Sequence, residues 1–209
     1  MTPRPLTPPA GSPDPADLFI SDTVKWLERA VIGLNLCPFA KGVHVKSQIH
    51  FAVTLALDPE EVLALLRREL ADLVAAPAVE RDTTLLILPR CLHDFLDFND
   101  FLADADAVLD SLDLVGTVQL ASFHPQFQFA GTDEDDVTNC TNRSPYPTLH
   151  LLREESIDRA VAVFPEAEAI FERNIEVLRD LGMEGWLALD VGASCPTHPT
   201  TLTTNGALR

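Results

Sequence analysis

The apolar run at residues 83–88, TTLLIL, constrains the fold more than any other segment of this chain. Its apolar residues are continuous and do not alternate with polar ones. A strand with this composition has to be covered by protein on both faces. The run therefore predicts a central strand of a sheet, with other elements packed against both sides.

Helix and strand patterns lie on both sides of this run. Asp58 and Pro59 are typical of a helix start, with a capping side chain followed by proline in the first turn. Strands that alternate with helices of this length indicate an α/β (or α+β) fold class. We expect a single layered domain, a small mixed sheet of roughly three to five strands flanked by helices, and a long ordered loop after the third strand. Strands are predicted near 48–57, 83–88, 115–122 and 149–152, and helices near 17–35, 58–77, 94–112, 156–164 and 165–182.

The ends of the chain differ in composition from its middle. Residues 1–15 hold six of the 16 prolines, which predicts an extended, disordered tail. Residues 191–209 are expected to form a loose C-terminal tail. The domain is therefore expected to span residues 16–190.

Charge and cysteine content limit the partners and the compartment. The formal net charge is −17, from 32 acidic and 15 basic residues, whereas nucleic acids and anionic membranes bind basic surfaces. We therefore expect no nucleic acid and no membrane as a partner. The N-terminus lacks the apolar segment of a secretory signal, and no apolar run of about 18 residues occurs. The cysteines form no C-x-x-C pair. Together with the lack of a secretory signal, this cysteine usage predicts a reducing, cytoplasmic location.

The segment 123–147 is the strongest candidate for a functional surface. It has no helical or strand periodicity, and connections of this length in compact domains are usually functional or disordered. Its aromatic residues argue for order, because side chains of that size favour burial. His124 directly follows a strand, where ligands collect in open α/β sheets, and an imidazole can act as a general base. His124 is therefore a candidate catalytic residue, and the alternative is that it only ties the loop to the strand.

Arg143 is the candidate for holding an anion. It lies between Asn142 and Ser144, and its guanidinium offers a fork for a carboxylate or a phosphate. The alternative is a salt bridge to an acidic residue of 133–136. The pattern predicts a small anionic ligand as the partner. Further candidates for substrate binding are Gln126, Phe127, Tyr146, His150 and Arg153.

Cys37 is a second candidate catalytic residue. It ends the first predicted helix, where the helix dipole disfavours a thiolate, although Lys41 or Lys46 can offset that effect. Cys37 is therefore either a nucleophile or a buried, inert residue. The acidic run at 132–136 lacks the oxygen ligand and the glycine of a calcium loop, so we expect a solvent-facing loop tip and assign no metal site.

Two segments resemble a bacterial family catalogued as domain of unknown function 1415. They are GLNLCPFAKG at 33–42 and the stretch 121–156, which begins ASFHPQFQFAG and ends NCTNRSPYPTLHLLREES. The resemblance covers about residues 16–190 and implies that the matching positions matter, but it brings no activity with it. Those positions are Cys37, Pro38, His124, Pro125, Phe127, Asn142, Arg143, Ser144, Pro145, Pro147, His150 and Arg153.

Three functions are compatible with these patterns. The first is an enzyme acting on a small anionic metabolite, in which Arg143 holds the anion, His124 moves a proton and Cys37 acts as nucleophile or lines the pocket. The second is a non-catalytic small-molecule-binding or regulatory module with the same pocket. The third is a metal-binding protein that uses His124, His150 and nearby acids. No Walker loop, G-x-G-x-x-G, G-x-S-x-G or H-E-x-x-H motif occurs, and the sequence identifies neither a cofactor nor an oligomeric state.

Overall fold

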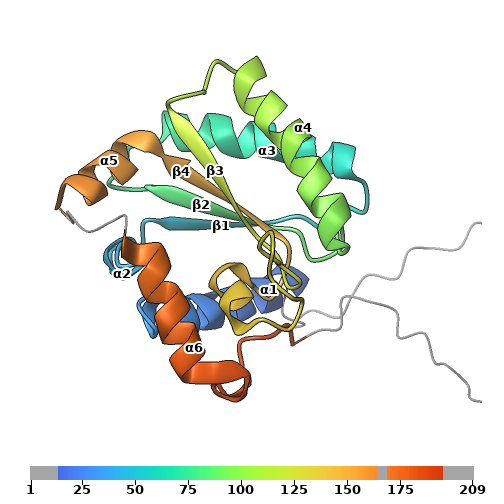
Figure 1. The fold of residues 1–209 in the computed structure, drawn as a ribbon. Coiled ribbons are helices and arrows are strands. Elements are labelled where there is room, and N and C mark those ends of the chain that lie inside the picture. The colour runs from blue at the N-terminus through green and yellow to red at the C-terminus, as the bar shows by residue number, and fades with distance from the viewer. Residues whose placement is uncertain (1–13, 164–168, 195–209) are drawn as a thin grey trace, which may run out of the picture.

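A single mixed sheet lies at the centre of the fold (Figure 1). The structure is a computed structural model, and it describes residues 14–163 and 169–194. The strand order is β1-β2-β4-β3. The first two strands are parallel, and β4 is antiparallel to both of its neighbours. The expected small mixed sheet flanked by helices is therefore confirmed. The strands are β1 (Ile49–Val53), β2 (Thr83–Ile87), β3 (Val118–Phe123) and β4 (Thr148–Arg153).

The two helices on the first face begin where the sequence predicts. Helix α3 (Pro59–Ala75) follows Asp58, whose side chain accepts a hydrogen bond from the backbone N–H of Glu60 at 2.8 Å. Helix α4 (Phe95–Ser111) follows Asp94, whose side chain accepts from the first turn in the same way. Each carboxylate satisfies a backbone donor that has no partner inside its own helix.

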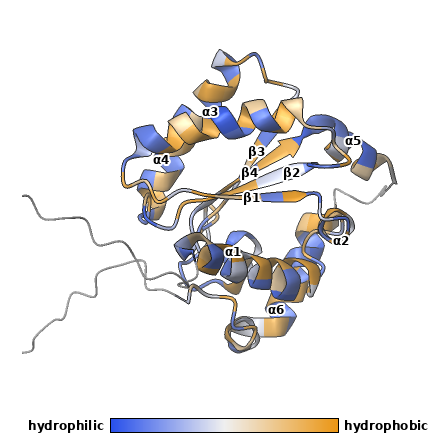
Figure 2. Cartoon of the chain, turned by 180° about the vertical axis from the view of Figure 1, so that it is seen from behind, coloured by the Kyte–Doolittle hydropathy of each residue, from blue (hydrophilic) through white to orange (hydrophobic). Residues whose placement is uncertain are grey.

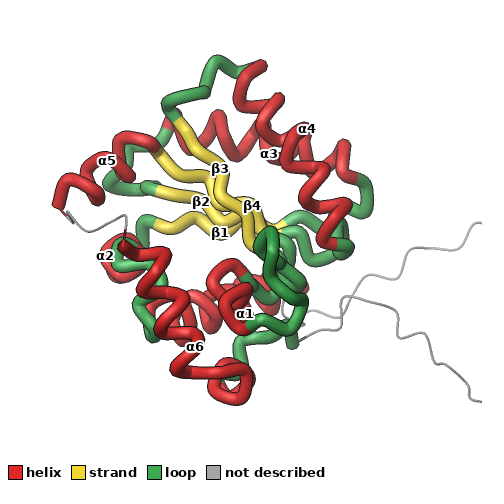
Figure 3. The backbone as a smooth tube through the Cα atoms, in the orientation of Figure 1, coloured by secondary structure: helices red, strands yellow, loops and turns green. Residues whose placement is uncertain are grey.

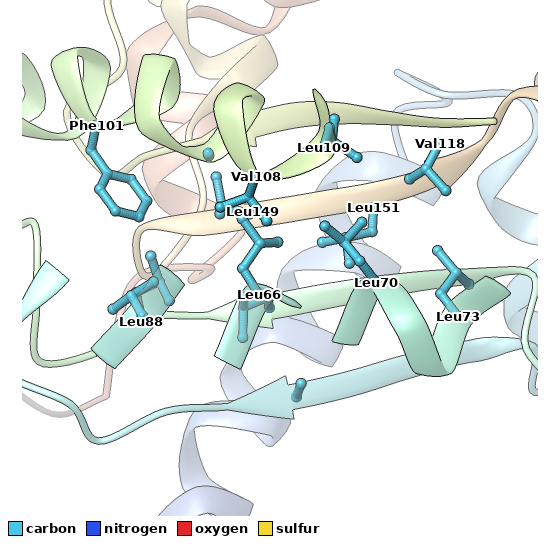
Figure 4. Packing of buried hydrophobic residues seen from close by; sticks show 14 of the residues in the cluster. Leu66, Leu70, Leu73, Leu88, Phe101, Val108, Leu109, Val118, Leu149 and Leu151 are labelled. Carbon is cyan, nitrogen blue, oxygen red and sulfur yellow. The ribbon is translucent and has the colours of Figure 1, made fainter. Parts of the chain in front are cut away.

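Helices α3 and α4 cover the first face of the sheet with aliphatic and aromatic side chains (Figure 4). Leu66 and Leu70 of α3 and Phe98 of α4 are fully buried against the sheet residues Leu149 and Leu151. Burying a side chain of this size stabilises the fold by roughly 1.5–3 kcal/mol. This face is a filled hydrophobic core, and it anchors the sheet.

A different set of helices covers the second face. Helix α1 continues into a short π-helical stretch, η1, and α6 packs beside it, while α2 lies at one end of the sheet (Figures 1 and 2). These helices carry both hydrophobic and hydrophilic residues along their length (Figure 2). None of the helices in the described part of the chain is long and apolar enough to cross a membrane. The bounds are α1 (Pro15–Trp26), η1 (Leu27–Ile32), α2 (Ala40–Val45) and α6 (Ile170–Ala188).

Several element boundaries differ from the sequence-based expectation. Helix α5 (Glu154–Val163) begins before Ser156, so Ser156 is not its cap, and the hydroxyl donates instead to the carboxylate of Asp82 at 2.6 Å. At Gly182, by contrast, the φ of 66° and ψ of 171° are non-helical, so the first part of α6 ends there as the sequence predicts and a second helical stretch follows to Ala188. Pro165, which was expected to open that helix, lies outside the described residues.

The segment between β3 and β4 lies at the opposite end of the sheet from α5 (Figure 3). It leads into the N-terminal end of β4, whereas α5 follows the C-terminal end of that strand. It also contains a 3-10 helix, η2 (Val137–Asn142), which the sequence pattern did not predict. Short 3-10 helices are common as connectors and have little periodicity to detect.

A buried carboxylate joins three distant parts of the chain. Asp22 of α1 is 4% exposed, and its Oδ2 accepts from the hydroxyl of Tyr146 at 2.6 Å and from the backbone N–H of Ser194 at 2.8 Å. Tyr146 is fully buried and stacks edge-on against Phe19 with ring centroids 5.1 Å apart. This arrangement ties α1 both to the end of the β3–β4 segment and to the chain after α6.

We expect Tyr146→Phe to lower the free energy of unfolding by about 1–3 kcal/mol. The substitution keeps the ring contact with Phe19 but takes one hydrogen-bond donor from a buried carboxylate. Urea denaturation followed by tryptophan fluorescence measures the loss. In an Asp22→Asn background the same substitution should cost less, because the acceptor is no longer charged. An unchanged denaturation midpoint for Tyr146→Phe would contradict the role assigned to this bond.

Candidate functional site

An apolar cavity of about 350 Å³ lies on the second face of the sheet. Its floor comes from all four strands, and its walls come from α1, η1, the turn before α2, α2 itself and α5. This volume is within the usual range for small-molecule sites, roughly 300–1,000 Å³. The residues that line it are Trp26, Leu27, Val31, Cys37, Phe39, Ala40, Val43, Ile49, Asp82, Thr83, Leu85, Ala121, Phe123, His150, Leu152, Arg153, Ser156, Ile157 and Ala160.

The helical wall of the cavity includes the π-helical stretch. Leu27 and Val31 belong to η1, and Trp26 ends the α-helix before it. Trp26 also packs edge-on against Phe123 of β3, with ring centroids 5.1 Å apart. π-Helical turns are rare and occur frequently at functional sites. Their presence here supports the cavity as the functional centre.

A polar pair lies in the otherwise apolar floor. Nε2 of His150 is 2.7 Å from the hydroxyl of Thr83, and this hydroxyl donates to the backbone carbonyl of Leu151 at 2.6 Å. His150 is placed by register, because it pairs with Leu85 on one side and with Ala121 on the other. Its side chain therefore projects from the middle of the sheet into the cavity.

Burial keeps His150 neutral at physiological pH. Desolvation lowers the pKa of its imidazole from 6.5 to about 4. A protonated imidazole would have to lose its hydration in an apolar surrounding, which disfavours the charged form. The floor of the cavity therefore presents a neutral imidazole.

Cys37 lies in the wall opposite the sheet, in a turn that α6 holds. Nδ2 of Asn174 donates to the carbonyl of Leu36 at 2.9 Å, and Arg173 donates to the carbonyl of Asn35 at 2.7 Å. Burial raises the pKa of the Cys37 thiol, and hydrogen bonds from backbone N–H groups only partly oppose that effect. The thiol is therefore protonated at neutral pH, which leaves it a weak nucleophile.

The polar residues near α5 are already bonded to protein groups. The Asp82 carboxylate accepts from Ser156 and lies 3.8 Å from the guanidinium of Arg159. The guanidinium of Arg153 donates to the backbone carbonyls of Leu73, of Ala76 at 2.6 Å and of Arg81. Two of these carbonyls lie at the C-terminal end of α3, where a cation is favourable. Arg153 thus has a structural task here.

His124 lies outside the cavity and is a fully satisfied core residue. Its Nε2 is 3.1 Å from the carbonyl of Leu92, and its Nδ1 accepts from the backbone N–H of Gln126 at 3.0 Å. The ring is fully buried and packs against Phe95 and Phe98 of α4. Desolvation lowers its pKa from 6.5 to about 4. Both ring nitrogens are occupied, so His124 ties the loop to its surroundings, which was the alternative role expected for it.

Arg143 also lies away from the cavity. Its guanidinium donates to the backbone carbonyls of Phe127 at 3.1 Å and Glu134 at 2.6 Å. It borders a separate, shallow depression together with Glu134 and Asp135, whose charges disfavour an anion. The structure therefore corrects the expected convergence. Cys37 lines the cavity, whereas Arg143 bonds within the β3–β4 segment and His124 bonds to Gln126 of that segment and to Leu92 before α4.

The remaining candidates of the β3–β4 segment mostly stabilise the segment itself. Asn142 donates to the carbonyl of Ser122, and Ser144 donates to the carbonyl of Tyr146. Phe127 packs against the rings of Phe95 and Phe129. Gln126 borders the shallow depression, and Tyr146 bonds the Asp22 carboxylate. Of the predicted site residues, only Cys37, His150 and Arg153 meet at the cavity.

The acidic run acts as a loop tip and a helix cap. Asp136 accepts from the backbone N–H of Thr138 at 2.8 Å and caps η2. Across residues 14–163 and 169–194, no group of three or more histidine, cysteine or acidic side chains is placed to hold a metal ion. Both nitrogens of His124 have other partners, so the expected metal set with His150 is not assembled there.

Sequence reasoning missed most of the cavity wall, including Trp26, Val43, Ala121 and Ile157. Their types are those of ordinary core residues, and no sequence signal separates a cavity wall from a filled core. Thr83 is the exception, because a hydroxyl on a strand covered on both faces must find a partner inside the protein. That requirement could have linked Thr83 to the nearby His150.

A family model described as a protein of unknown function (DUF1415) matches residues 18–188. The comparisons with curated proteins and with solved structures found no match. The matched span contains every residue that lines the cavity, from Trp26 to Ala160. The cavity therefore lies entirely inside the domain that defines the family.

The two buried histidines should make stability depend on pH. Unfolded histidine takes up a proton near pH 6.5, whereas His124 and His150 in the folded chain do so only at about 4. Acid therefore favours the unfolded chain, and stability is lost as pH falls from 6.5 towards 4. We expect each histidine to contribute a loss of about 2 kcal/mol between about pH 7 and pH 5.

Urea denaturation of the wild type and of His150→Gln at matched pH values checks this expectation. The difference in stability between the two proteins should change by about 2 kcal/mol across that interval, because the other titrating groups are common to both. A difference that stays constant with pH would show that His150 titrates normally in the folded state.

Proposed function

We propose that this chain, which belongs to the DUF1415 family of proteins of unknown function, is a binding module for small, mainly apolar molecules. One observation carries the proposal. The cavity between the sheet and the helices α1, α2 and α5 has the volume of a ligand site and an almost wholly apolar lining. Such cavities with a few convergent polar groups are the usual places where small molecules bind.

The packing of the two faces of the sheet supports this location. On the first face, side chains of α3 and α4 fill the space above the strands. On the second face, comparable helices leave about 350 Å³ unfilled next to Leu85, Ala121 and Phe123. An apolar hollow of this size leaves its lining side chains without the dispersion contacts that a filled core provides. A ligand that fills the cavity restores those contacts.

The protonation states favour binding over chemistry. An enzyme that used Cys37 as a nucleophile would need a thiolate, and burial raises the pKa of that thiol. The imidazole of His150 is neutral as well, with a pKa of about 4. The polar groups near α5 are bonded to one another or to backbone carbonyls. This environment suits an uncharged ligand better than the small anion that the sequence led us to expect.

Native mass spectrometry of the protein taken directly from cells tests the proposal with its natural ligand. We expect a bound, mainly apolar small molecule that is released on denaturation and is chemically unchanged after prolonged incubation with the protein. Recovery of a converted product would instead support the enzymatic alternative.

A cavity-filling substitution should abolish ligand binding without unfolding the protein. Ala121→Leu adds apolar volume from β3 into the cavity, whereas Ala71→Leu makes the same chemical change at an exposed position of α3. Toluene at about ten times its Kd should stabilise the wild type and Ala71→Leu by about 1.4 kcal/mol and raise their Tm by a few degrees. Ala121→Leu should show no such shift.

Thermal unfolding followed by tryptophan fluorescence measures these shifts. Equal stabilisation of all three proteins would place toluene outside the cavity. If neither toluene nor its hydroxylated analogue phenol stabilised the wild type, the proposed binding role would be wrong.

A further inference from the structure

The hydrogen bonds around His150 determine which tautomer its ring adopts. The hydroxyl of Thr83 has one proton, and it lies 2.6 Å from the carbonyl oxygen of Leu151, which can only accept. The hydroxyl of Thr83 therefore donates its one hydrogen bond to the carbonyl oxygen of Leu151. The same hydroxyl oxygen lies 2.7 Å from Nε2 of His150, so the proton of that second bond has to come from the imidazole. His150 is held with its proton on Nε2.

The other ring nitrogen, Nδ1, is then an acceptor with a free lone pair. Among the described residues, no hydrogen bond to Nδ1 is found. In the same part of the chain, the one fully buried side-chain nitrogen or oxygen without a partner is Oδ1 of Asn174. Nδ1 of His150 therefore retains accessible surface, and the surface on that side of the sheet is the cavity that His150 lines.

An unpaired acceptor in the mainly apolar floor of the cavity sets a chemical requirement. A ligand without a donor leaves Nδ1 desolvated and unpaired when it fills the cavity, and that costs free energy. A ligand with a hydroxyl or an N–H group directed at Nδ1 satisfies the acceptor and its own donor at once. A carboxylate or a fully ionised phosphate group offers only acceptors. Its oxygens would be repelled by the lone pair of Nδ1.

We propose that the cavity selects uncharged, mainly apolar molecules that carry one hydrogen-bond donor, such as a phenol or an alcohol, and that Nδ1 of His150 accepts that donor. Thr83 is a positioning residue in this scheme, because it holds the proton on Nε2 and so keeps Nδ1 available. The inference rests on the proposed binding function and adds the class of ligand.

Phenol and toluene are matched probes for this selectivity, because they differ by a hydroxyl in place of a methyl group. Binding of each is measured by isothermal titration calorimetry or by the ligand-induced shift in thermal unfolding. The quantity of interest is the ratio of the Kd of toluene to the Kd of phenol. His150→Leu removes the acceptor and leaves the hydroxyl of phenol unpaired in an apolar site, so this ratio should fall on the order of tenfold or more.

Variants of Thr83 distinguish the role of its hydroxyl in orienting the His150 imidazole from the role of its side-chain shape in lining the cavity. Thr83→Val keeps the shape of the side chain but removes the hydroxyl, so the imidazole loses the bond that selects its tautomer. We expect the phenol preference, which is the ratio of the Kd of toluene to the Kd of phenol, to fall on the order of tenfold. Thr83→Ser retains the hydroxyl and should restore the phenol preference. A lost preference in Thr83→Ser as well would overturn the positioning role.

A spectroscopic measurement on the wild type avoids any dependence on the folding of a variant. Nitrogen NMR of protein labelled with ¹⁵N-histidine should show a protonated Nε2 and an unprotonated Nδ1 for His150 at neutral pH. The Nδ1 resonance should move on addition of phenol and stay in place on addition of toluene. A proton on Nδ1 in the free protein, or an Nδ1 resonance that ignores bound phenol, would overturn the inference.

The two proposals fail in different ways. If toluene and phenol both fail to bind, the cavity has no binding role. If toluene binds and the phenol-to-toluene preference is the same in the wild type and in His150→Leu, the binding role stands and the selectivity for donors is wrong.

Discussion

Strand β2 is buried on both of its faces, and this burial dictates the layered arrangement of the fold. All five residues of Thr83–Ile87 are buried, and the strand pairs with β1 on one side and β4 on the other. Two separate groups of helices are therefore needed, one for each face. The first group, α3 and α4, forms a filled core with the sheet. The second group, which includes α1 and η1, must cover a face that carries polar side chains, and there the cavity appears.

The polar residues of that second face explain why it is covered in a different way. Thr83 and His150 project from neighbouring strands into an apolar space, where each polar atom needs a partner. They satisfy each other and the carbonyl of Leu151, with one ring nitrogen of His150 left over. A neutral imidazole in this position is tolerated because burial keeps it unprotonated. The same arrangement that limits the cost of burial therefore creates a defined acceptor in the cavity.

The β3–β4 segment shows how a loop rich in functional groups can use them on itself. The side-chain oxygen of Asn139 accepts from Phe129 and Thr132, and its nitrogen donates to the carbonyl of Asp133. His124 and Arg143 bond to backbone groups in the same way. A segment this long without sheet or α-helical bonding leaves many backbone groups unpaired, and side chains pair them. The residues that suggested catalysis are thus largely occupied in holding the segment together.

The local features of this protein can be derived from its amino-acid sequence. The cap at Asp58, the helix start at residue 94, the doubly buried strand at 83–88 and the α/β class follow from short-range rules of propensity, capping and burial, and the structure has them at the expected places. His150 and Cys37 could also be named as site candidates from their residue types. The folded chain shows that these two line one cavity with Thr83 and Trp26, whereas His124 and Arg143 do not. The physical reason is that convergence depends on strand register and helix packing, which are long-range properties. The order β1-β2-β4-β3 places His150 beside Leu85 and Ala121, and no local pattern in the chain specifies that neighbourhood.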